Sequence, residues 1–391
     1  MTVKTQTAAK PAYSPGLEGV IAGITSISEV DADANRLTYR GYDVADLVNE
    51  CSFDEVAHLL LLGKLPTCGE LTEFRQKVGE ARHVPGVVYD LLSHLPPSTH
   101  PMDTLRAAVS TLAAFDEDRE SNTRAANIEK AIRLYARMPA LVVNGHRILN
   151  GLPPIAPDPR LDHNTNFFHM LGSIASLPPA LADARGLRED IFNVTQILYA
   201  EHGYNASTFA ARVTVSTLSD LHSGVVSAIG ALKGPLHGGA NEAAMEMLVE
   251  IGDASKASEW VRTALARKRK IMGFGHREYK NGDVRAKIVK ERAVALGRKM
   301  GDTHWHEISE VVEEEMRTAK GLLPNLDFPV ASAYALMGIP TPMFTPIFVM
   351  ARITGWCAHI MEQLDNNRLI RPANGYDGPR GLKVAMLEDR C

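Results

Sequence analysis

The sequence has few cysteines and places none of them in a metal-binding or disulfide pattern. Four occur among its 391 residues, without CxxC spacing, namely Cys51, Cys68, Cys357 and Cys391. Zinc sites and disulfide frameworks need regularly spaced cysteines, so neither is indicated, and a reducing compartment is expected. The N-terminus also has no apolar segment of the secretory-signal type. We therefore expect a cytoplasmic protein whose residues 1–16 form a flexible tail.

Long apolar runs and an excess of one charge are also missing. The longest apolar stretch, 346–362, is shorter than the roughly 20 residues of a membrane span and contains Arg352. Charged residues make up 23% of the chain and the formal net charge is −4, with no basic cluster to mark a nucleic-acid or lipid surface. The expected partner is a small molecule, not nucleic acid or a membrane.

Helical periodicity is what the sequence does have. Residues 17–42 alternate weakly around a turn-rich DADAN segment and predict one short β-hairpin. Capping boxes at Ser52 with Glu55 and at Thr67 with Glu70 begin two helices, the first ending at Gly63. Further helical runs cover 105–115, 129–145, 166–174, 189–203, 207–234, 241–251, 257–270, 284–301, 306–321 and 346–362. About a dozen helices and one hairpin predict an all-α protein, and the length allows a large and a smaller domain.

Two histidines follow or precede glycines next to predicted helix starts. His237 lies in GPLHGGANE, where glycines let the backbone approach a ligand and the next helix would favour a neutral imidazole. A neutral ring can donate a hydrogen bond to a carbonyl that becomes an enolate. His276 lies in GFGHREYKNGDVRA, where Asp283 is expected to cap a helix with Arg285 in its first turn. A loop-capping histidine and a basic surface loop are the simpler interpretations.

Asp327 and Arg352 stand in apolar surroundings. Leu326, Phe328 and Pro329 flank Asp327, which should raise the pKa of its carboxyl and make it a better base, although an aspartate at such a place is commonly a turn or cap. Arg352 lies in an apolar helix where an unpaired guanidinium is expensive to bury. It needs either an internal carboxylate such as Glu362 or a bound anion.

Other catalytic motifs do not account for these residues. His202, His237, His276 and Asp327 are too widely spaced for a local metal motif such as HExxH, so no metal site is expected. The sequence contains no GxSxG elbow. The GFGH segment is not preceded by a strand or followed by a dinucleotide-binding pattern. The set instead indicates carbon-acid chemistry on a polyanionic substrate.

The same segments resemble the citrate synthase family. The resemblance runs from about residue 16 to 376 and is carried by LTYRGYDV, EVAHLLLLGKLPT, HPMDTLR, LYAEHGYNASTFAARV, GALKGPLHGGANE, KIMGFGHREYK, PNLDFP and FTPIFVMARITGWCAHIMEQ. Within the family the chain is most similar to bacterial 2-methylcitrate synthases. Two departures are Val284, where proline is frequent, and Glu278, whose carboxylate could pair with Arg277 or Arg285.

The resemblance implies a role for each residue of the set. His237 would stabilise the enol of an acyl-CoA, Asp327 would remove its α-proton, and His276 would polarise the ketone of oxaloacetate. Oxaloacetate would be held by His202, Arg285 and Arg352, with Arg371 supplied by the partner subunit of a homodimer. The coenzyme A site would be lined by Lys270, Ile271, Met272, Gly273 and Phe274.

The resemblance also implies an architecture and a reaction. It implies a large helical domain of residues 17–239 and 336–391, and a small one of residues 240–335 that closes on it. The expected reaction joins propionyl-CoA, oxaloacetate and water into 2-methylcitrate and coenzyme A, without a cofactor, and acetyl-CoA is a second substrate. Alternatives are a citrate synthase that uses acetyl-CoA as its main substrate, a lyase of the citryl-CoA type, and a helical scaffold without enzymatic activity.

Overall fold

The computed structural model describes residues 13–172, 179–279 and 281–390. The predicted hairpin is present as β1 (Ser28–Asp31) and β2 (Arg36–Tyr39), paired antiparallel with Val30 opposite Leu37. A third strand, β3 (Tyr42–Asp43), extends it to a three-stranded sheet that the sequence did not indicate. The predicted tail lies mostly outside the described residues. Of its residues 13–16, the last two begin a short 3₁₀ helix, η1 (Pro15–Leu17).

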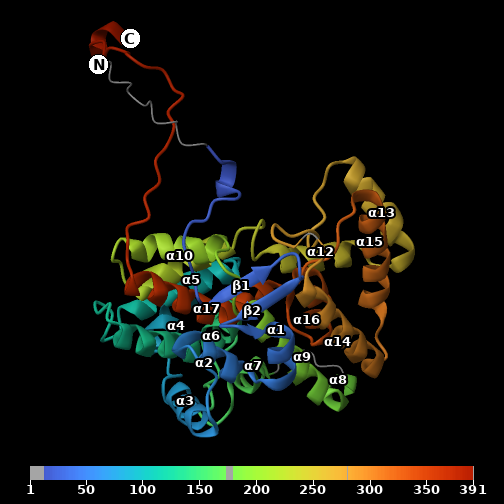
Figure 1. Ribbon diagram of the computed structural model, residues 1–391. Coiled ribbons are helices and arrows are strands. Elements are labelled where there is room, and N and C mark those ends of the chain that lie inside the picture. The colour runs from blue at the N-terminus through green and yellow to red at the C-terminus, as the bar shows by residue number, and fades with distance from the viewer. Residues whose placement is uncertain (1–12, 173–178, 280, 391) are drawn as a thin grey trace.

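Helices form all the other regular secondary structure of the described residues, so the all-α prediction is confirmed (Figure 1). In chain order they are α1 (Val44–Glu50), α2 (Phe53–Leu62), α3 (Cys68–Glu80), α4 (Gly86–Ser93), α5 (Pro101–Ala113), α6 (Arg124–Leu149), α7 (His163–Leu171), α8 (Pro179–Asp183), α9 (Arg185–Tyr199), α10 (Ala206–Ser216), α11 (Leu221–Leu232), α12 (Ala240–Ile251), α13 (Ala254–Ala266), α14 (Val284–Met300), α15 (His304–Lys320), α16 (Asp327–Leu336), η3 (Thr341–Met343), α17 (Phe344–Asp365) and η4 (Leu387–Arg390).

The capping signals read from the sequence are confirmed. Ser52 and Glu55 form a reciprocal capping box at the start of α2, and Thr67 and Glu70 form another at the start of α3. Each pair satisfies two backbone N–H groups that a helix start would otherwise leave without a partner. Helix α2 ends at Gly63, whose φ of 89° is the left-handed conformation that glycine adopts without strain.

One predicted helix is wrong in its extent. The run 207–234 is two helices, α10 and α11, because the chain turns at 217–220, where Leu218 has a φ of 70° and Asp220 caps α11. Helices α1, α4, α8 and α16 were not expected. All four have ten residues or fewer, which is too short for a clear helical period. Helix α16 begins at the Asp327–Phe328–Pro329 segment, which was interpreted as a turn or cap.

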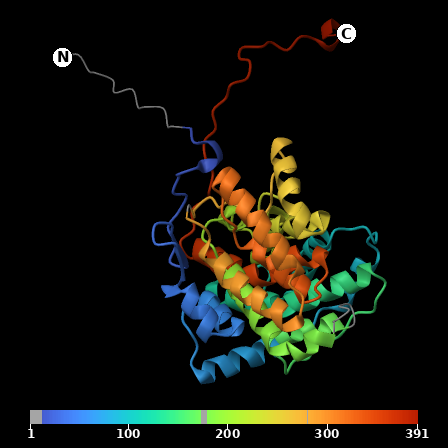
Figure 2. The ribbon, with the colours of Figure 1, turned by 90° about the vertical axis from the view of Figure 1, so that its right-hand side faces the viewer.

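Helix α17 runs through the middle of the molecule and organises the site. It is buried along almost its whole length and packs against α2, α6, α9, α10 and α11. Helices α12 to α16 lie together on one side of the molecule (Figure 1), which the rotated view of Figure 2 brings to the front. This grouping covers the predicted small domain, whose boundaries stay a prediction. Among the described residues no helix is long and apolar enough to cross a membrane.

Candidate active site

A pairing between two distant loops joins the segment of His276 to the segment that precedes Asp327. The Asn325 N–H donates to the Gly273 carbonyl at 2.9 Å, and the Gly275 N–H donates to the Leu323 carbonyl at 2.9 Å. Gly273 has a φ of 83°, and a Cβ at this position would lie 2.8 Å from the Cβ of Phe328. Glycine is therefore required here both for the backbone conformation and for the close approach. Segments 50 residues apart are thus joined beside the start of α16.

The Asp327 carboxylate is the first side chain of α16 and faces a buried tyrosine. The Tyr199 hydroxyl donates to Asp327 Oδ1 at 2.7 Å. Burial raises the pKa of Asp327 to about 6, while the Tyr199 hydrogen bond and the charges of Arg285 and Arg352 oppose this rise. The predicted rise is confirmed, and its cause is loss of solvation, as the apolar neighbours indicated. A carboxylate with this pKa is ionised at neutral pH and basic enough to accept a proton from a weak carbon acid.

His237 is a neutral imidazole whose tautomer is fixed by the start of α10. The Ser207 backbone N–H donates to His237 Nε2 at 3.3 Å, and Ser207 Oγ lies 2.8 Å from the same nitrogen. Because Nε2 accepts from a backbone N–H, the ring proton is on Nδ1, which is free to donate elsewhere. Burial, and secondly the charge of Arg352, lower the pKa of His237 to about 3. The neutral ring is as predicted, but burial is its main cause, not the helix that follows it.

His202, in the loop between α9 and α10, lies next to His276, in the loop between α13 and α14. Their ring centroids are 4.9 Å apart, and His202 Nε2 lies 3.3 Å from the Tyr279 hydroxyl. The backbone N–H groups of Glu278 and Tyr279 donate to His276 Nδ1 at 3.1 and 3.3 Å. The proton of a neutral His276 is therefore on Nε2. Burial, followed by the Arg285 charge, lowers the pKa of His276 to about 4 and that of His202 well below its ordinary value.

Arg285 is paired with Asp283, two residues before it. Its Nε and Nη2 donate to the two Asp283 carboxylate oxygens at 2.9 and 2.8 Å. Asp283 also accepts the Arg285 backbone N–H at 3.0 Å, as the predicted cap of α14, and the Leu326 N–H at 3.1 Å. Burial lowers the pKa of Arg285, but the Asp283 charge outweighs this and raises it overall. Among the described residues Glu278 pairs with neither Arg277 nor Arg285.

Arg352 is almost fully buried in α17 without a paired carboxylate. Its Nε donates to the Tyr199 carbonyl at 2.5 Å, and its guanidinium lies 4.8 Å from the centre of the Phe348 ring. Glu362, the internal partner considered from the sequence, is instead paired with Arg212 at 2.9 Å. In the part of the chain that the structure describes, no carboxylate lies within ion-pairing distance of Arg352. Burial lowers the pKa of Arg352 to about 10, so it is a cation that an anionic ligand would stabilise.

Six of the predicted site residues therefore come together. His202, His237 and Arg352 come from loops and α17, while His276, Arg285 and Asp327 come from segment 271–327. Their electrostatic coupling confirms the proximity, because Arg285 and Arg352 both act on the pKa values of His202 and Asp327.

Of the remaining predicted residues, Gly273 and Phe274 pack against Phe328, next to Asp327, whereas Arg371 is not in contact with the described residues of this group. The exposed Arg371 follows α17 in a segment that extends away from the body of the molecule (Figure 2). Of the predicted coenzyme A loop, Lys270 is exposed, Met272 and Phe274 are half-buried, and Ile271 and Gly273 are buried.

Several residues in direct contact with the site were not identified from the sequence. They are Tyr199, Ser207, Tyr279, Asp283 in its pairing role, and Phe348. Tyr199 and Ser207 flank the segment that contains His202, and Asp283 had been interpreted only as a helix cap. Tyrosine, serine and phenylalanine are common in helices, so only the three-dimensional contact distinguishes these positions.

The arrangement can perform acid–base chemistry on an anionic substrate. It combines a carboxylate of raised pKa, two neutral imidazoles, His237 and His276, whose ring N–H groups are free to donate, and two buried guanidinium groups. Buried cations of this kind bind carboxylates strongly because little water competes. Among the described residues, no group of three or more His, Cys, Asp or Glu side chains could hold a metal ion.

Comparison with known proteins agrees with this geometry. The family model described as citrate synthase, C-terminal domain, matches residues 16–373. A 2-methylcitrate synthase of Mycobacterium tuberculosis is 50% identical over 94% of this chain and 91% of its own length. A citrate/2-methylcitrate synthase of Bacillus subtilis is 45% identical over 95% and 98%. A solved structure described as the ternary complex of carboxymethyl coenzyme A and oxaloacetate with citrate synthase from Thermoplasma acidophilum matches with a TM-score of 0.89 at 34% identity, covering 97% of this chain and 100% of the other.

Proposed function

Because the chain belongs to the citrate synthase family, we propose that it is a 2-methylcitrate synthase. It condenses propionyl-CoA with oxaloacetate and water, and releases 2-methylcitrate and free coenzyme A. The observation that carries this proposal is the grouping of a raised-pKa carboxylate, neutral histidines and two buried arginines, in a chain half identical to a protein of that name. Citrate synthase activity on acetyl-CoA is the second candidate, favoured by curated relatives of that name at 46% and 45% identity.

Oxaloacetate binding is the role of the cationic side of the site. Arg352, which has no paired carboxylate among the described residues, and Arg285 would hold the two carboxylates, and His202 would donate a further hydrogen bond. Arg285 remains paired with Asp283 through Nε and Nη2, which leaves its Nη1 for a ligand. Binding a dianion offsets the cost of burying two guanidinium groups in one place.

Proton removal from the acyl-CoA is the role of Asp327 and His237. Asp327 would take the α-proton, and the His237 Nδ1–H would donate to the thioester oxygen as negative charge develops there. A neutral donor suits this step, since an imidazolium would transfer its proton at once to the enolate oxygen. The pKa of His237, lowered to about 3, keeps the ring neutral at physiological pH.

Carbon–carbon bond formation follows at the oxaloacetate ketone. The His276 Nε2–H would donate to this carbonyl oxygen, which becomes the hydroxyl of the product. Water then hydrolyses the thioester and releases coenzyme A. Neither step changes the oxidation state of the substrates taken together, so the reaction needs no redox cofactor, and we propose that the protein's own side chains suffice.

Domain closure and a second subunit would complete the active site. His276, Arg285 and Asp327 lie within the predicted small domain, 240–335, while His202, His237 and Arg352 lie in the predicted large one. Closure would assemble the site around oxaloacetate and exclude water until condensation. The segment from 270 to 274 would line the coenzyme A site. We propose a cytoplasmic homodimer in which the exposed Arg371 enters the partner's site.

A steady-state comparison of the two thioesters tests the substrate assignment. One methylene is worth only about 0.8 kcal/mol in an apolar pocket, so we expect activity on both with a higher kcat/KM for propionyl-CoA. Thiol release in the presence of oxaloacetate measures the rates. If acetyl-CoA has the higher kcat/KM by more than about tenfold, or roughly 1.4 kcal/mol, the chain is a citrate synthase instead.

A further inference from the structure

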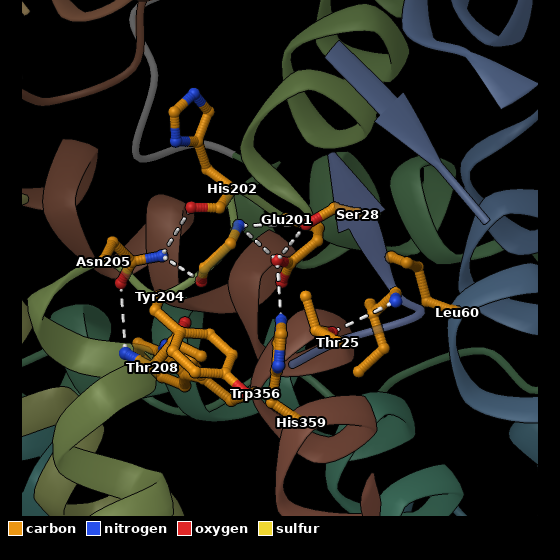
Figure 3. Close-up of polar contacts among 12 residues, drawn as sticks. Thr25, Ser28, Leu60, Glu201, His202, Tyr204, Asn205, Thr208, Trp356 and His359 are labelled. Atoms are coloured by element: carbon orange, nitrogen blue, oxygen red, sulfur yellow. Dashed lines mark hydrogen bonds and ion pairs between the residues drawn. The ribbon is translucent and has the colours of Figure 1, made fainter. Parts of the chain in front are cut away.

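The loop that contains His202 is held from its far side by a buried carboxylate. Glu201 is fully buried, and its Oε1 accepts hydrogen bonds from His359 Nε2 at 2.8 Å, Ser28 Oγ at 2.8 Å and the Gly203 N–H at 2.5 Å. Figure 3 shows the Glu201 carboxylate and the His202 imidazole on opposite sides of the loop. The Glu201 side chain thus accepts a hydrogen bond from the backbone of Gly203, two residues later. This contact restrains the backbone of His202, which lies between them.

The same segment follows one face of α17. Arg352, Gly355 and His359 are spaced i, i+3 and i+7, so they share a face of this helix. Arg352 Nε donates to the Tyr199 carbonyl, and His359 binds Glu201. Between them, a Cβ on Gly355 would collide with the Ala200 carbonyl oxygen and a Glu201 carboxylate oxygen. Residues 199–201 therefore lie directly against α17 at three successive points.

Glu201 belongs to a network of polar side chains that also contains His359, Arg212 and Glu362. Arg212 Nη1 donates to His359 Nδ1 at 3.3 Å, so this nitrogen is an acceptor and the ring proton is on the Nε2 that donates to Glu201. Arg212 is itself paired with Glu362. Glu201 Oε2 is buried without a hydrogen-bond partner among the described residues. Burial alone would raise the pKa of Glu201, but His359, Arg352 and Ser28 lower it, so the group is a carboxylate whose charge acts on Arg352.

We propose that Glu201 is a positioning residue that fixes His202 relative to Arg352 for binding of the four-carbon dicarboxylate. The inference rests on the proposed function, because these two side chains are its oxaloacetate ligands. They come from different elements, and Glu201 with α17 is what sets the distance between them. Ligands placed in advance save the free energy that ordering them would cost, and displacements of about 1 Å at such sites reduce binding or turnover strongly.

The test is calorimetric titration of the full-length protein with oxaloacetate alone. Glu201→Gln keeps the size of the side chain but removes its charge, and we expect the Kd for oxaloacetate to rise at least about tenfold, or 1.4 kcal/mol. Ser28→Ala removes the hydrogen bond to the same oxygen and also the one that Ser28 Oγ accepts from the Gly203 N–H at 3.0 Å, and it should raise Kd by about two- to threefold. The KM for propionyl-CoA at saturating oxaloacetate should stay within about twofold of wild type.

Glu362→Gln is the matched control, since it removes a carboxylate of the same network that binds Arg212, Thr25 and Ser26 but not the His202 loop. Its Tm should fall while the Kd for oxaloacetate is unchanged. An equal rise of Kd in Glu362→Gln, or unchanged Kd in Glu201→Gln and Ser28→Ala, overturns the inference. If Glu201→Gln does not fold, Ser28→Ala decides alone. Wild-type protein that neither binds oxaloacetate nor releases thiol overturns the proposed function itself.

Discussion

At the scale of single residues, burial is what makes ordinary side chains reactive. Loss of solvation raises the pKa of Asp327 to about 6 and lowers that of His237 to about 3. At neutral pH Asp327 is thereby an ionised carboxylate and His237 an uncharged imidazole, the forms that the proposed enolisation needs. Hydrogen bonds modify these effects. The one from the Tyr199 hydroxyl opposes the rise of the Asp327 pKa, and the one from the Ser207 N–H selects the His237 tautomer.

The pH dependence of turnover follows from Asp327. Its proposed action as a base requires the ionised form, so kcat/KM should fall as the pH drops below about 6, the pKa raised by burial. Tyr199→Phe removes the hydrogen bond that lowers this pKa, and the acid limb should move upward by about one unit. Tyr334→Phe is the control, because the Tyr334 hydroxyl donates to Thr195. An acid limb that is the same in all three proteins would contradict the assignment of Asp327.

At the scale of elements, close backbone approach positions the loops of the candidate site. Because Gly355 has no Cβ, segment 199–201 can pack directly against α17. Gly273 in the same way lets the His276 loop pack against Phe328. Gly355→Ala forces a Cβ against the Ala200 carbonyl, and we expect a loss of stability of about 2 kcal/mol or more, with loss of oxaloacetate binding. Urea denaturation measures the first effect.

Gly230→Ala provides the matched comparison for Gly355→Ala. Gly230 is exposed in α11, and nothing lies within 4 Å of where its Cβ would be. The substitution should stabilise the protein by about 0.5–1 kcal/mol, because alanine is the better helix former. Equal tolerance of both substitutions would show that segment 199–201 does not pack on α17 as described.

Local sequence signals predicted the elements better than their ends. The capping boxes at Ser52 and Thr67 were read correctly because a serine or threonine with glutamate three residues later has one strong structural meaning. The break at 217–220 was missed although Asp220 carries a capping signal, since apolar periodicity continues through it. The contacts of Tyr199 and Glu201 had no local signal, because they depend on residues 128 and 158 positions away.

At the scale of the whole molecule, buried uncharged histidines make the fold sensitive to acid. His163 is fully buried, stacks on Tyr135 at 4.1 Å, and neither of its ring nitrogens has a hydrogen-bond partner among the described residues. Burial holds its pKa well below the ordinary value. Below about pH 6.5 this histidine therefore binds a proton in the unfolded chain but not in the folded chain. The free energy of unfolding decreases as the pH falls below about 6.5.

His163→Phe removes this penalty and keeps an aromatic ring at the stack. The free energy of unfolding should change little at about pH 7.5. At about pH 5.5 the variant should be more stable than wild type by about 1.4 kcal/mol beyond any difference at the higher pH. Urea titrations at the two pH values measure both quantities. A constant difference between the proteins would mean that His163 is not held neutral by the fold.

The proposed dimer predicts that active sites are shared between subunits. Arg371→Ala and Asp327→Asn should each be inactive when pure. A heterodimer of the two would contain one doubly defective site and one intact site, so remixing equal amounts should restore about a quarter of wild-type activity. Activity after joint unfolding and refolding measures this. No recovery, with dimers formed, would place Arg371 in its own subunit's site, and an active Arg371→Ala protein would place it outside any site.

The most direct test of the account is whether the release of coenzyme A depends jointly on oxaloacetate and Asp327. Purified protein is incubated with propionyl-CoA, and free thiol is followed before and after oxaloacetate is added, for wild type and for Asp327→Asn. We expect release only after oxaloacetate is added, one thiol for each oxaloacetate consumed, and a loss of turnover of about three orders of magnitude or more in the folded variant. Release without oxaloacetate, or an Asp327→Asn variant as active as wild type, would contradict the proposed mechanism.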